Sequence, residues 1–278
     1  MPIRLLAIDL DGTLLNSRAE ISPGNRQALC AAVERGVHVA IVTGRRFHSA
    51  SPMVNQLPCP VTLICSNGAL IRSENGEIVH RDFLPRDVAL EALRASRPYR
   101  PHAVAIFDIP TRGQVTMQKG ASPDGPLSWY VNKSPEFLAT VPELEDAIEI
   151  DPIQLMFGGP PAYMAPLEGI LRESSAGEKV HLTWTKYFSR NMSLLDVLSP
   201  TCSKGAALRL WAERRRISPG EIMAIGDNYN DREMLEFCGH PVLMRNCTPG
   251  LGQSHWCVTD SNDQDGVAAA VHSYILGS

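Results

Sequence analysis

Two aspartates near the start of this chain have a spacing that suits chemistry. Asp9 and Asp11 follow the apolar run 3–8 and precede Gly12 and Thr13. Residues i and i+2 of an extended segment point the same way, so both carboxylates should converge at the carboxyl end of a strand. Open α/β sheets place their active sites at that edge. A turn that begins with glycine can also direct backbone N–H groups at an anion.

Convergent carboxylates beside amide donors suggest a divalent cation together with a phosphate. Alone, however, the Asp-x-Asp pattern is explained equally well by a strand-ending turn with two solvated acids. Three further polar clusters favour the first interpretation, because each begins a predicted helix or follows a predicted apolar strand. Their residues are Thr43 and Gly44, then Lys204, whose charge adds to a positive helix end, then Asp227, Asn230 and Asp231.

The elements around these clusters predict a doubly wound α/β fold. Strands are expected at 3–8, 37–42, 61–65, 221–225, 241–244 and 256–259, and helices at 25–35, 203–216, from 230 onward and at 266–275. Ser22 should cap the first helix, with Pro23 at its first position and Gly36 beyond its end. Strands that are apolar almost throughout are typical of a parallel sheet covered on both faces. We therefore expect a mainly parallel, Rossmann-like sheet.

The middle of the chain has a different texture. Prolines are frequent, strand-like stretches occur at 114–118, 148–157 and 180–188, and a helix is expected at 162–173. This pattern predicts an α+β unit with an antiparallel sheet, inserted into the first domain. The expected domains are a catalytic core at 1–82 and 190–278 and a cap at 83–189.

The composition is that of an ordinary soluble protein. The 278 residues are 44% hydrophobic and 20% charged, with a net charge of −4 that gives no footprint for nucleic acid. The basic run 214–216 is interpreted as a solvated helix end. Seven cysteines, without a Cys-x-x-Cys pair, argue against a disulfide framework or a zinc site. A strand starting at the third residue leaves no room for a signal peptide, and no run spans a bilayer. We expect a cytoplasmic monomer or small homo-oligomer.

Together these motifs resemble the four signatures of the haloacid dehalogenase-like phosphohydrolase superfamily. The matching residues are the segment 9–13, Thr43, Lys204, and the segment 226–231. The Asn67-Gly68-Ala69 turn and the late Asp265-Gly266-Val267 are similar to the Cof-type branch, which carries a class IIB cap where the insertion is predicted. The resemblance covers essentially the whole chain. One departure is Arg245, beside an asparagine that relatives commonly flank with small residues.

The resemblance implies a mechanism and a role for each site residue. Asp9 would be the nucleophile that forms an aspartyl-phosphate, and Asp11 would be the general acid and base. Thr43 and Lys204 would complete the catalytic set, and the implied Mg²⁺ ligands are Asp9, Asp11, Asp227 and Asp231. Phosphate binding is implied for Gly12, Thr43, Gly44, Lys204 and Asn230. Charge stabilisation of this kind supplies most of the catalysis in phosphoryl transfer.

The implied activity is hydrolysis of a small phosphorylated metabolite, a sugar phosphate or a phosphorylated cofactor. Cap residues around 183–186 are expected to contact the leaving group. A phosphomutase or phosphotransferase would use the same aspartyl-phosphate, and a non-catalytic phosphosugar-binding protein is a further alternative. A receiver-type signalling domain is disfavoured by length, and a nucleotide cofactor by the absence of a Gly-x-Gly-x-x-Gly or P-loop motif.

Overall fold

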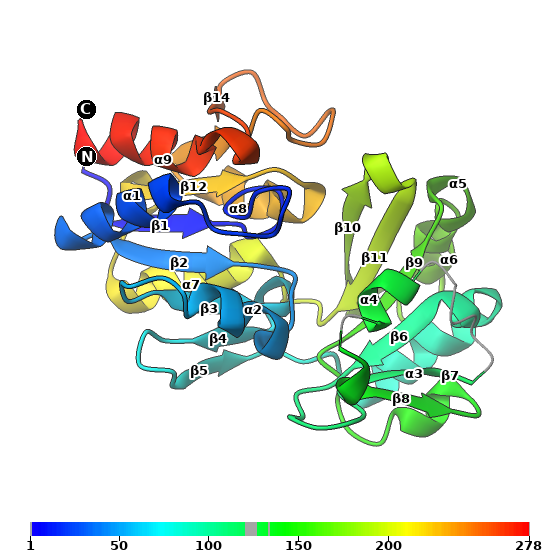
Figure 1. Cartoon of the computed structure of the whole chain (residues 1–278). Helices are drawn as coiled ribbons and strands as arrows, with labels where there is room; N and C mark the ends of the chain where they lie inside the picture. The colour runs from blue at the N-terminus through cyan, green and yellow to red at the C-terminus, as the bar shows by residue number, and fades with distance from the viewer. Residues whose placement is uncertain (1, 120–126, 133, 278) are drawn as a thin grey trace. The chain divides into compact units, whose positions relative to one another are not determined.

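The computed structural model describes residues 2–119, 127–132 and 134–277, which form two compact units (Figure 1). Unit 1 comprises Met1–Arg81 and Ser203–Ser278, and unit 2 comprises Asp82–Cys202. The expected boundary at 82/83 is thus off by one residue, whereas the boundary at 189/190 is wrong. Residues 190–202 belong to unit 2 because β11 (Met192–Leu198) pairs along its length with β9 (Gln154–Gly159) and β10 (His181–Tyr187).

Unit 1 is built on an eight-stranded sheet with the order β14-β13-β12-β1-β2-β3-β4-β5. The first six strands in that order run parallel, and the β3-β4-β5 end is antiparallel. The predicted α/β fold with a mainly parallel sheet is confirmed. The strands are β1 (Leu5–Ile8), β2 (His38–Val42), β3 (Thr62–Cys65), β4 (Leu70–Arg72), β5 (Ile78–Arg81), β12 (Ile222–Gly226), β13 (His240–Leu243) and β14 (Cys257–Val258).

Helices cover both faces of this sheet. On β1, Leu6 and Ile8 belong to one buried cluster, and Leu5 and Ala7 belong to another. The first cluster includes residues of α1 (Pro23–Glu34), α2 (Phe47–Val54) and α9 (Gly266–Val271), and the second includes residues of α7 (Lys204–Arg215) and α8 (Arg232–Phe237). Burial on both faces explains why β1 is apolar at every position. Shorter helical turns are η1 (Ser66–Gly68), η7 (Pro219–Glu221), η8 (Tyr229–Asp231), η9 (Asn262–Gln264) and the π-helical His272–Leu276.

The helix starts of unit 1 follow their capping residues. The Ser22 hydroxyl accepts from the Asn25 backbone N–H, and Pro23 is the first residue of α1, which confirms the predicted cap. Ser203 caps α7 in the same way, so Lys204 is its first residue. The spacing of Asn230 and Glu233 in the sequence also predicts a capping box, and this prediction is wrong. The box joins Asn228 to Asp231 instead, because the helical turn begins at Tyr229.

Unit 2 contains a six-stranded sheet with the order β10-β11-β9-β6-β7-β8, antiparallel except between β7 and β8. Its other strands are β6 (Ala103–Ile106), β7 (Val115–Gln118) and β8 (Leu138–Val141), and its helices are α3 (Arg86–Ala95), α4 (Ser128–Val131), α5 (Pro161–Met164) and α6 (Leu167–Glu173). Its helical turns are η2 (Arg97–His102), η3 (Pro135–Phe137), η4 (Leu144–Ala147), η5 (Gly177–Lys179) and η6 (Phe188–Arg190). The predicted helix 162–173 is divided at Pro166, and the predicted strand 148–157 starts only at Gln154.

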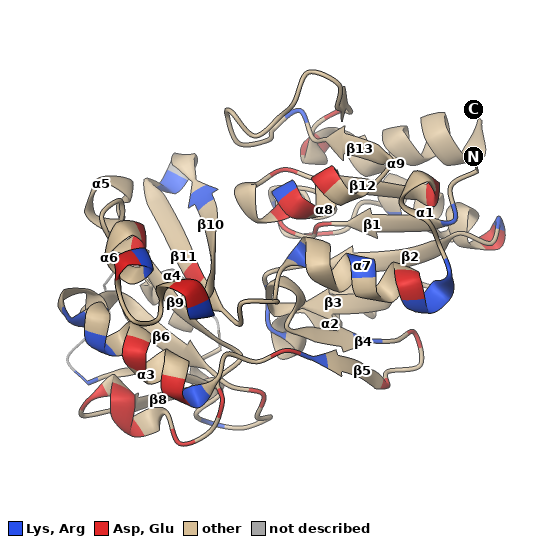
Figure 2. Ribbon diagram, turned by 180° about the vertical axis from the view of Figure 1, so that it is seen from behind, with Lys and Arg blue, Asp and Glu red and all other residues tan. Residues whose placement is uncertain are grey.

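Charged residues of both signs lie along the helices of each unit, as on α3, α6 and α7 (Figure 2). All seven cysteines are free thiols. No helix in the described part of the chain is both long and apolar enough to span a bilayer.

Candidate active site

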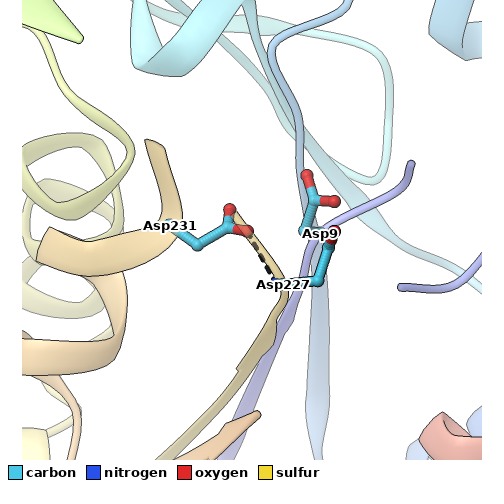
Figure 3. A group of neighbouring side chains, drawn as sticks. All are labelled: Asp9, Asp227 and Asp231. Carbon is cyan, nitrogen blue, oxygen red and sulfur yellow. Dashed lines mark hydrogen bonds between the residues drawn. The ribbon is translucent and has the colours of Figure 1, made fainter. Parts of the chain in front are cut away.

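Three buried carboxylates meet where two central strands end. Asp9 follows β1, while Asp227 and Asp231 follow β12, and each offers an oxygen within 4.8 Å of the others (Figure 3). The strands β1 and β12 are parallel neighbours, and the Asp9 backbone N–H donates to the Ile225 carbonyl at 3.0 Å. The fold thus brings together three of the four acids predicted to bind metal.

Lys204 lies between two of these acids. Its Nζ is 2.5 Å from Asp9 Oδ1 and 2.6 Å from Asp231 Oδ1, and its side chain is 1% exposed. Burial by itself would lower the pKa of Lys204, but the charges of Asp231 and Asp9 outweigh burial and raise that pKa above its ordinary value. The lysine is therefore a fixed positive charge against the Asp9 carboxylate.

Asp231 organises the loop as well as the lysine. Its Oδ2 accepts from the backbone N–H groups of Asp227 and Asn228, both at 3.0 Å, while its Oδ1 faces Lys204. The Thr13 hydroxyl in turn donates to Asp227 Oδ1 at 2.8 Å. These bonds fix the position of the Asp227 carboxylate relative to the end of β1.

The cluster carries more negative charge than its single lysine balances. Burial, followed by the charge of Asp231, raises the pKa of Asp9 to about 7. Burial also raises the pKa of Asp227 well above its usual range, with Asp9 and Asp231 adding to the effect. An all-oxygen site with this surplus of negative charge suits a hard divalent cation, since Mg²⁺ takes few protein carboxylates and completes its shell with water and phosphate. The residues fit the implied metal.

The Asp11 carboxylate does not join the cluster. It is half-exposed and forms a two-point ion pair with Arg45, with Nε 2.5 Å from Oδ2 and the second nitrogen 2.5 Å from Oδ1. The resemblance implies metal binding through the backbone carbonyl of Asp11, which does not require its side chain to join the cluster. Arg45 directly follows Thr43 and Gly44 in the sequence, and its pairing with Asp11 was not predicted.

The residues predicted to bind phosphate lie at four places in unit 1: the loop after β1, the loop after β2, the start of α7 and the turn η8. Gly12 has a φ of +83°, and a Cβ there would lie 2.5 Å from Asp227 Oδ2, so only glycine is accommodated. Thr43 is 1% exposed after β2, and its hydroxyl oxygen accepts from the Arg45 backbone N–H at 3.1 Å. Gly44 lies between Thr43 and Arg45 in the same loop.

Two asparagines that sequence reasoning left without a role hold these loops. Asn246 donates through Nδ2 to the Gly12 carbonyl at 2.8 Å. Asn67 accepts from Asn230 Nδ2 at 3.0 Å. Arg245, which departs from the pattern of the family, forms an ion pair with Asp260 at 3.0 Å, and its side chain is 66% exposed. Local sequence does not predict the contacts of the two asparagines, because the partners lie 234 and 163 positions away.

This fold and site define a family. The family model described as haloacid dehalogenase-like hydrolase matches residues 6–271, and the chain belongs to that family. Phosphatase YwpJ of Bacillus subtilis is 29% identical to it, over 96% of this chain and 98% of that protein. The HMP-PP phosphatase of Serratia proteamaculans is 31% identical over 89% of this chain and 86% of that protein. The predicted family and the predicted class of enzyme, a phosphatase, are confirmed.

Solved structures agree with this assignment. A haloacid dehalogenase-like hydrolase from Bacillus subtilis is 26% identical, with a TM-score of 0.77 over 97% of this chain and 99% of that chain. SMU.1108c from Streptococcus mutans shares the fold at 21% identity, with a TM-score of 0.84 over 99% of this chain and 100% of that chain.

Proposed function

We propose that this protein is a Mg²⁺-dependent phosphatase that hydrolyses a small phosphorylated metabolite through an aspartyl-phosphate at Asp9. One observation carries the proposal. The Asp9 carboxylate at the end of β1 lies against the buried Lys204, in a cluster of three acids whose charge this one lysine does not balance. In water such a carboxylate is a weak nucleophile, but a fixed neighbouring cation can hold it ionised and oriented.

In the first half-reaction Asp9 Oδ attacks phosphorus, and the bond from phosphorus to the leaving oxygen breaks. Asp11 gives its proton to that oxygen. In the second half-reaction Asp11 takes a proton from water, the water oxygen attacks phosphorus, and the bond to Asp9 breaks. A carboxyl must be free to move protons, so Asp11 has to exchange its pairing with Arg45 for the reacting oxygens during turnover.

The remaining site residues would bind the metal and the phosphate or hold other site residues in position. Mg²⁺ would be held by Asp9, Asp227 and the Asp11 carbonyl, and when bound it would neutralise charge on the carboxylates and the phosphate. Both Asp231 oxygens are already engaged, so its part is to hold Lys204 and the Asp227 loop, with any contact to the metal through water. The phosphate oxygens would be bound by Thr43, Gly12, Gly44, Lys204 and Asn230. Thr43 would donate the hydrogen of its hydroxyl group.

A phosphorylated cofactor or a sugar phosphate remains the proposed substrate class. The names of two relatives support a small phosphorylated metabolite as the substrate. One is named a pyridoxal phosphate phosphatase, from Escherichia coli, at 25% identity, and another a 5-amino-6-(5-phospho-D-ribitylamino)uracil phosphatase, from Bacillus subtilis, at 27%. Unit 2 is proposed as the substrate-selecting cap, with Thr183–Lys186 on β10 as candidate contacts to the leaving group.

Release of inorganic phosphate tests the proposal. Wild type and Asp9→Asn are incubated with a panel of phosphorylated cofactors and sugar phosphates, with Mg²⁺ or with a chelator. We expect release by wild type with Mg²⁺ only, and a loss of at least about a thousandfold in Asp9→Asn, since the nucleophile is removed. Equal rates for the two proteins would refute the proposed nucleophile. Transfer of the phosphoryl group to a second hydroxyl, with no free phosphate, would identify a mutase.

A further inference from the structure

The η1 turn, Ser66–Gly68, has an unfavourable backbone conformation in a buried place. Ser66 and Asn67 both have left-handed φ angles, +50° and +54°, and each is 1% exposed. Within the described part of the chain, the buried Ser66 hydroxyl has no hydrogen-bond partner. In residues other than glycine, a left-handed backbone conformation lowers the stability of the folded state, and so does a buried polar group without a partner. Both features persist only where the surrounding structure imposes them.

The surroundings that impose this turn include the loop after β2. The Asn67 backbone N–H donates to the Thr43 carbonyl at 3.0 Å, and the Ser66 N–H donates to the Arg45 carbonyl at 2.9 Å. A Cβ placed on Gly44 would lie 3.0 Å from Asn67 Oδ1, so the Asn67 amide packs directly on this loop. These contacts therefore join the turn to the segment that carries the Thr43 hydroxyl and the Gly44 amide.

The same turn also contacts two of the other elements proposed to bind the phosphate. Asn67 Oδ1 accepts from Asn230 Nδ2 at 3.0 Å, across 163 positions of sequence. A side chain on Gly68 would collide with the Ser203 carbonyl, one residue before Lys204 at the start of α7. One short turn thus lies against three of the four elements that are proposed to bind the phosphate: the loop after β2, the turn η8 and the start of α7.

We propose that Asn67 is a positioning residue for the phosphate subsite, acting through Asn230. This inference rests on the proposed function. The position needs a residue that tolerates the left-handed conformation and also offers an oxygen acceptor in a short side chain, and asparagine meets both needs. The bond uses one of the two N–H donors of Asn230 and fixes the orientation of its amide, so that the phosphate meets a pre-oriented group.

The decisive variant is Asn67→Gly, because glycine adopts the same backbone conformation without strain but lacks the acceptor. We expect the thermal midpoint to stay the same or rise. We also expect kcat/KM to fall roughly 10- to 100-fold and inhibition by inorganic phosphate to weaken by a similar factor. Arg216→Gly is the matched control, since Arg216 also has a left-handed φ, +54°, but closes α7 at the end opposite Lys204. It should leave catalysis unchanged.

A double-mutant cycle identifies the route of action. If Asn67 acts through Asn230, then Asn67→Gly should have almost no further effect in the Asn230→Ala background. Independent, multiplying losses would overturn the proposal. So would wild-type kcat/KM and phosphate inhibition in Asn67→Gly, because asparagine would then serve the backbone alone.

Calorimetric binding of inorganic phosphate to the Mg²⁺-loaded proteins separates this inference from the proposed function. Binding needs no turnover. A wild type that binds phosphate but hydrolyses nothing would refute the phosphatase proposal while leaving the comparison of Asn67→Gly with wild type intact. Equal phosphate affinity in these two proteins would refute the role of Asn67 whatever the catalytic outcome.

Discussion

Removal of divalent cations should make stability fall as the pH rises. Without a cation, burial and the charge of Asp231 raise the pKa of Asp9 from 3.8 to about 7. A carboxyl whose pKa is higher in the folded state than in the unfolded state binds more protons when folded. Its contribution to the free energy of unfolding is therefore complete below pH 3.8 and is lost as the pH rises through about 7.

The magnitude follows from the separation of the two pKa values. It corresponds to about 4 kcal/mol in total, of which about 3 kcal/mol falls between roughly pH 5 and pH 8. Burial also raises the pKa of Asp227, so its contribution to the free energy of unfolding likewise falls as the pH rises. Mg²⁺ replaces the proton as the balancing positive charge, and binding to the folded state alone adds stability.

Urea unfolding of wild type and Asp9→Asn at the two pH values, with chelator or with Mg²⁺, measures this effect. In chelator, wild type should lose about 3 kcal/mol more than Asp9→Asn on going to the higher pH, because asparagine does not titrate. Saturating Mg²⁺ should remove most of that difference. Parallel pH profiles for the two proteins in chelator would refute the electrostatic account of the cluster.

Three further substitutions test neighbouring parts of the structure. Lys204→Met should abolish turnover and destabilise the metal-free protein by about 3–5 kcal/mol, since it leaves Asp9 buried without its cation; phosphate release and urea unfolding check this. Gly68→Ala should lower stability by more than about 1 kcal/mol, because its φ is +108° and the added Cβ meets the Ser203 carbonyl; an unchanged urea midpoint would contradict it. Phe157→Ala, at a fully buried position, should cost unit 2 about 3–5 kcal/mol, measured by proteolysis within Asp82–Cys202.

The sheet of unit 1 and the meeting of Asp9 with Asp227 could be predicted from sequence. Strands buried on both faces must be apolar throughout, and the polar residues that follow them lie at one edge of a parallel sheet. The same rule explains the error at the domain boundary. The segment Met192–Leu198 is mostly apolar and buried along its length, and its pairing with β9 and β10 places it in unit 2.

The contacts that orient the site could not be predicted, because nothing local encodes them. Asn67 meets Asn230 from 163 positions away, and Asp11 meets Arg45 from 34. The sequence indicates that each of these residues follows a strand. It does not indicate which side chains form hydrogen bonds with one another. The assigned roles of Asp9, Asp11 and the phosphate-binding residues likewise stay predictions until they are measured.

Detection of the covalent intermediate tests the central claim most directly. The Mg²⁺-loaded enzyme is mixed with its fastest substrate, quenched in acid within the first turnover, digested and examined by mass spectrometry. The account predicts a phosphoryl group on the peptide that contains Asp9, transient in wild type, prolonged in Asp11→Asn and absent in Asp9→Asn. Phosphate release that continues in Asp9→Asn, with no phosphopeptide at any time in wild type, would contradict it.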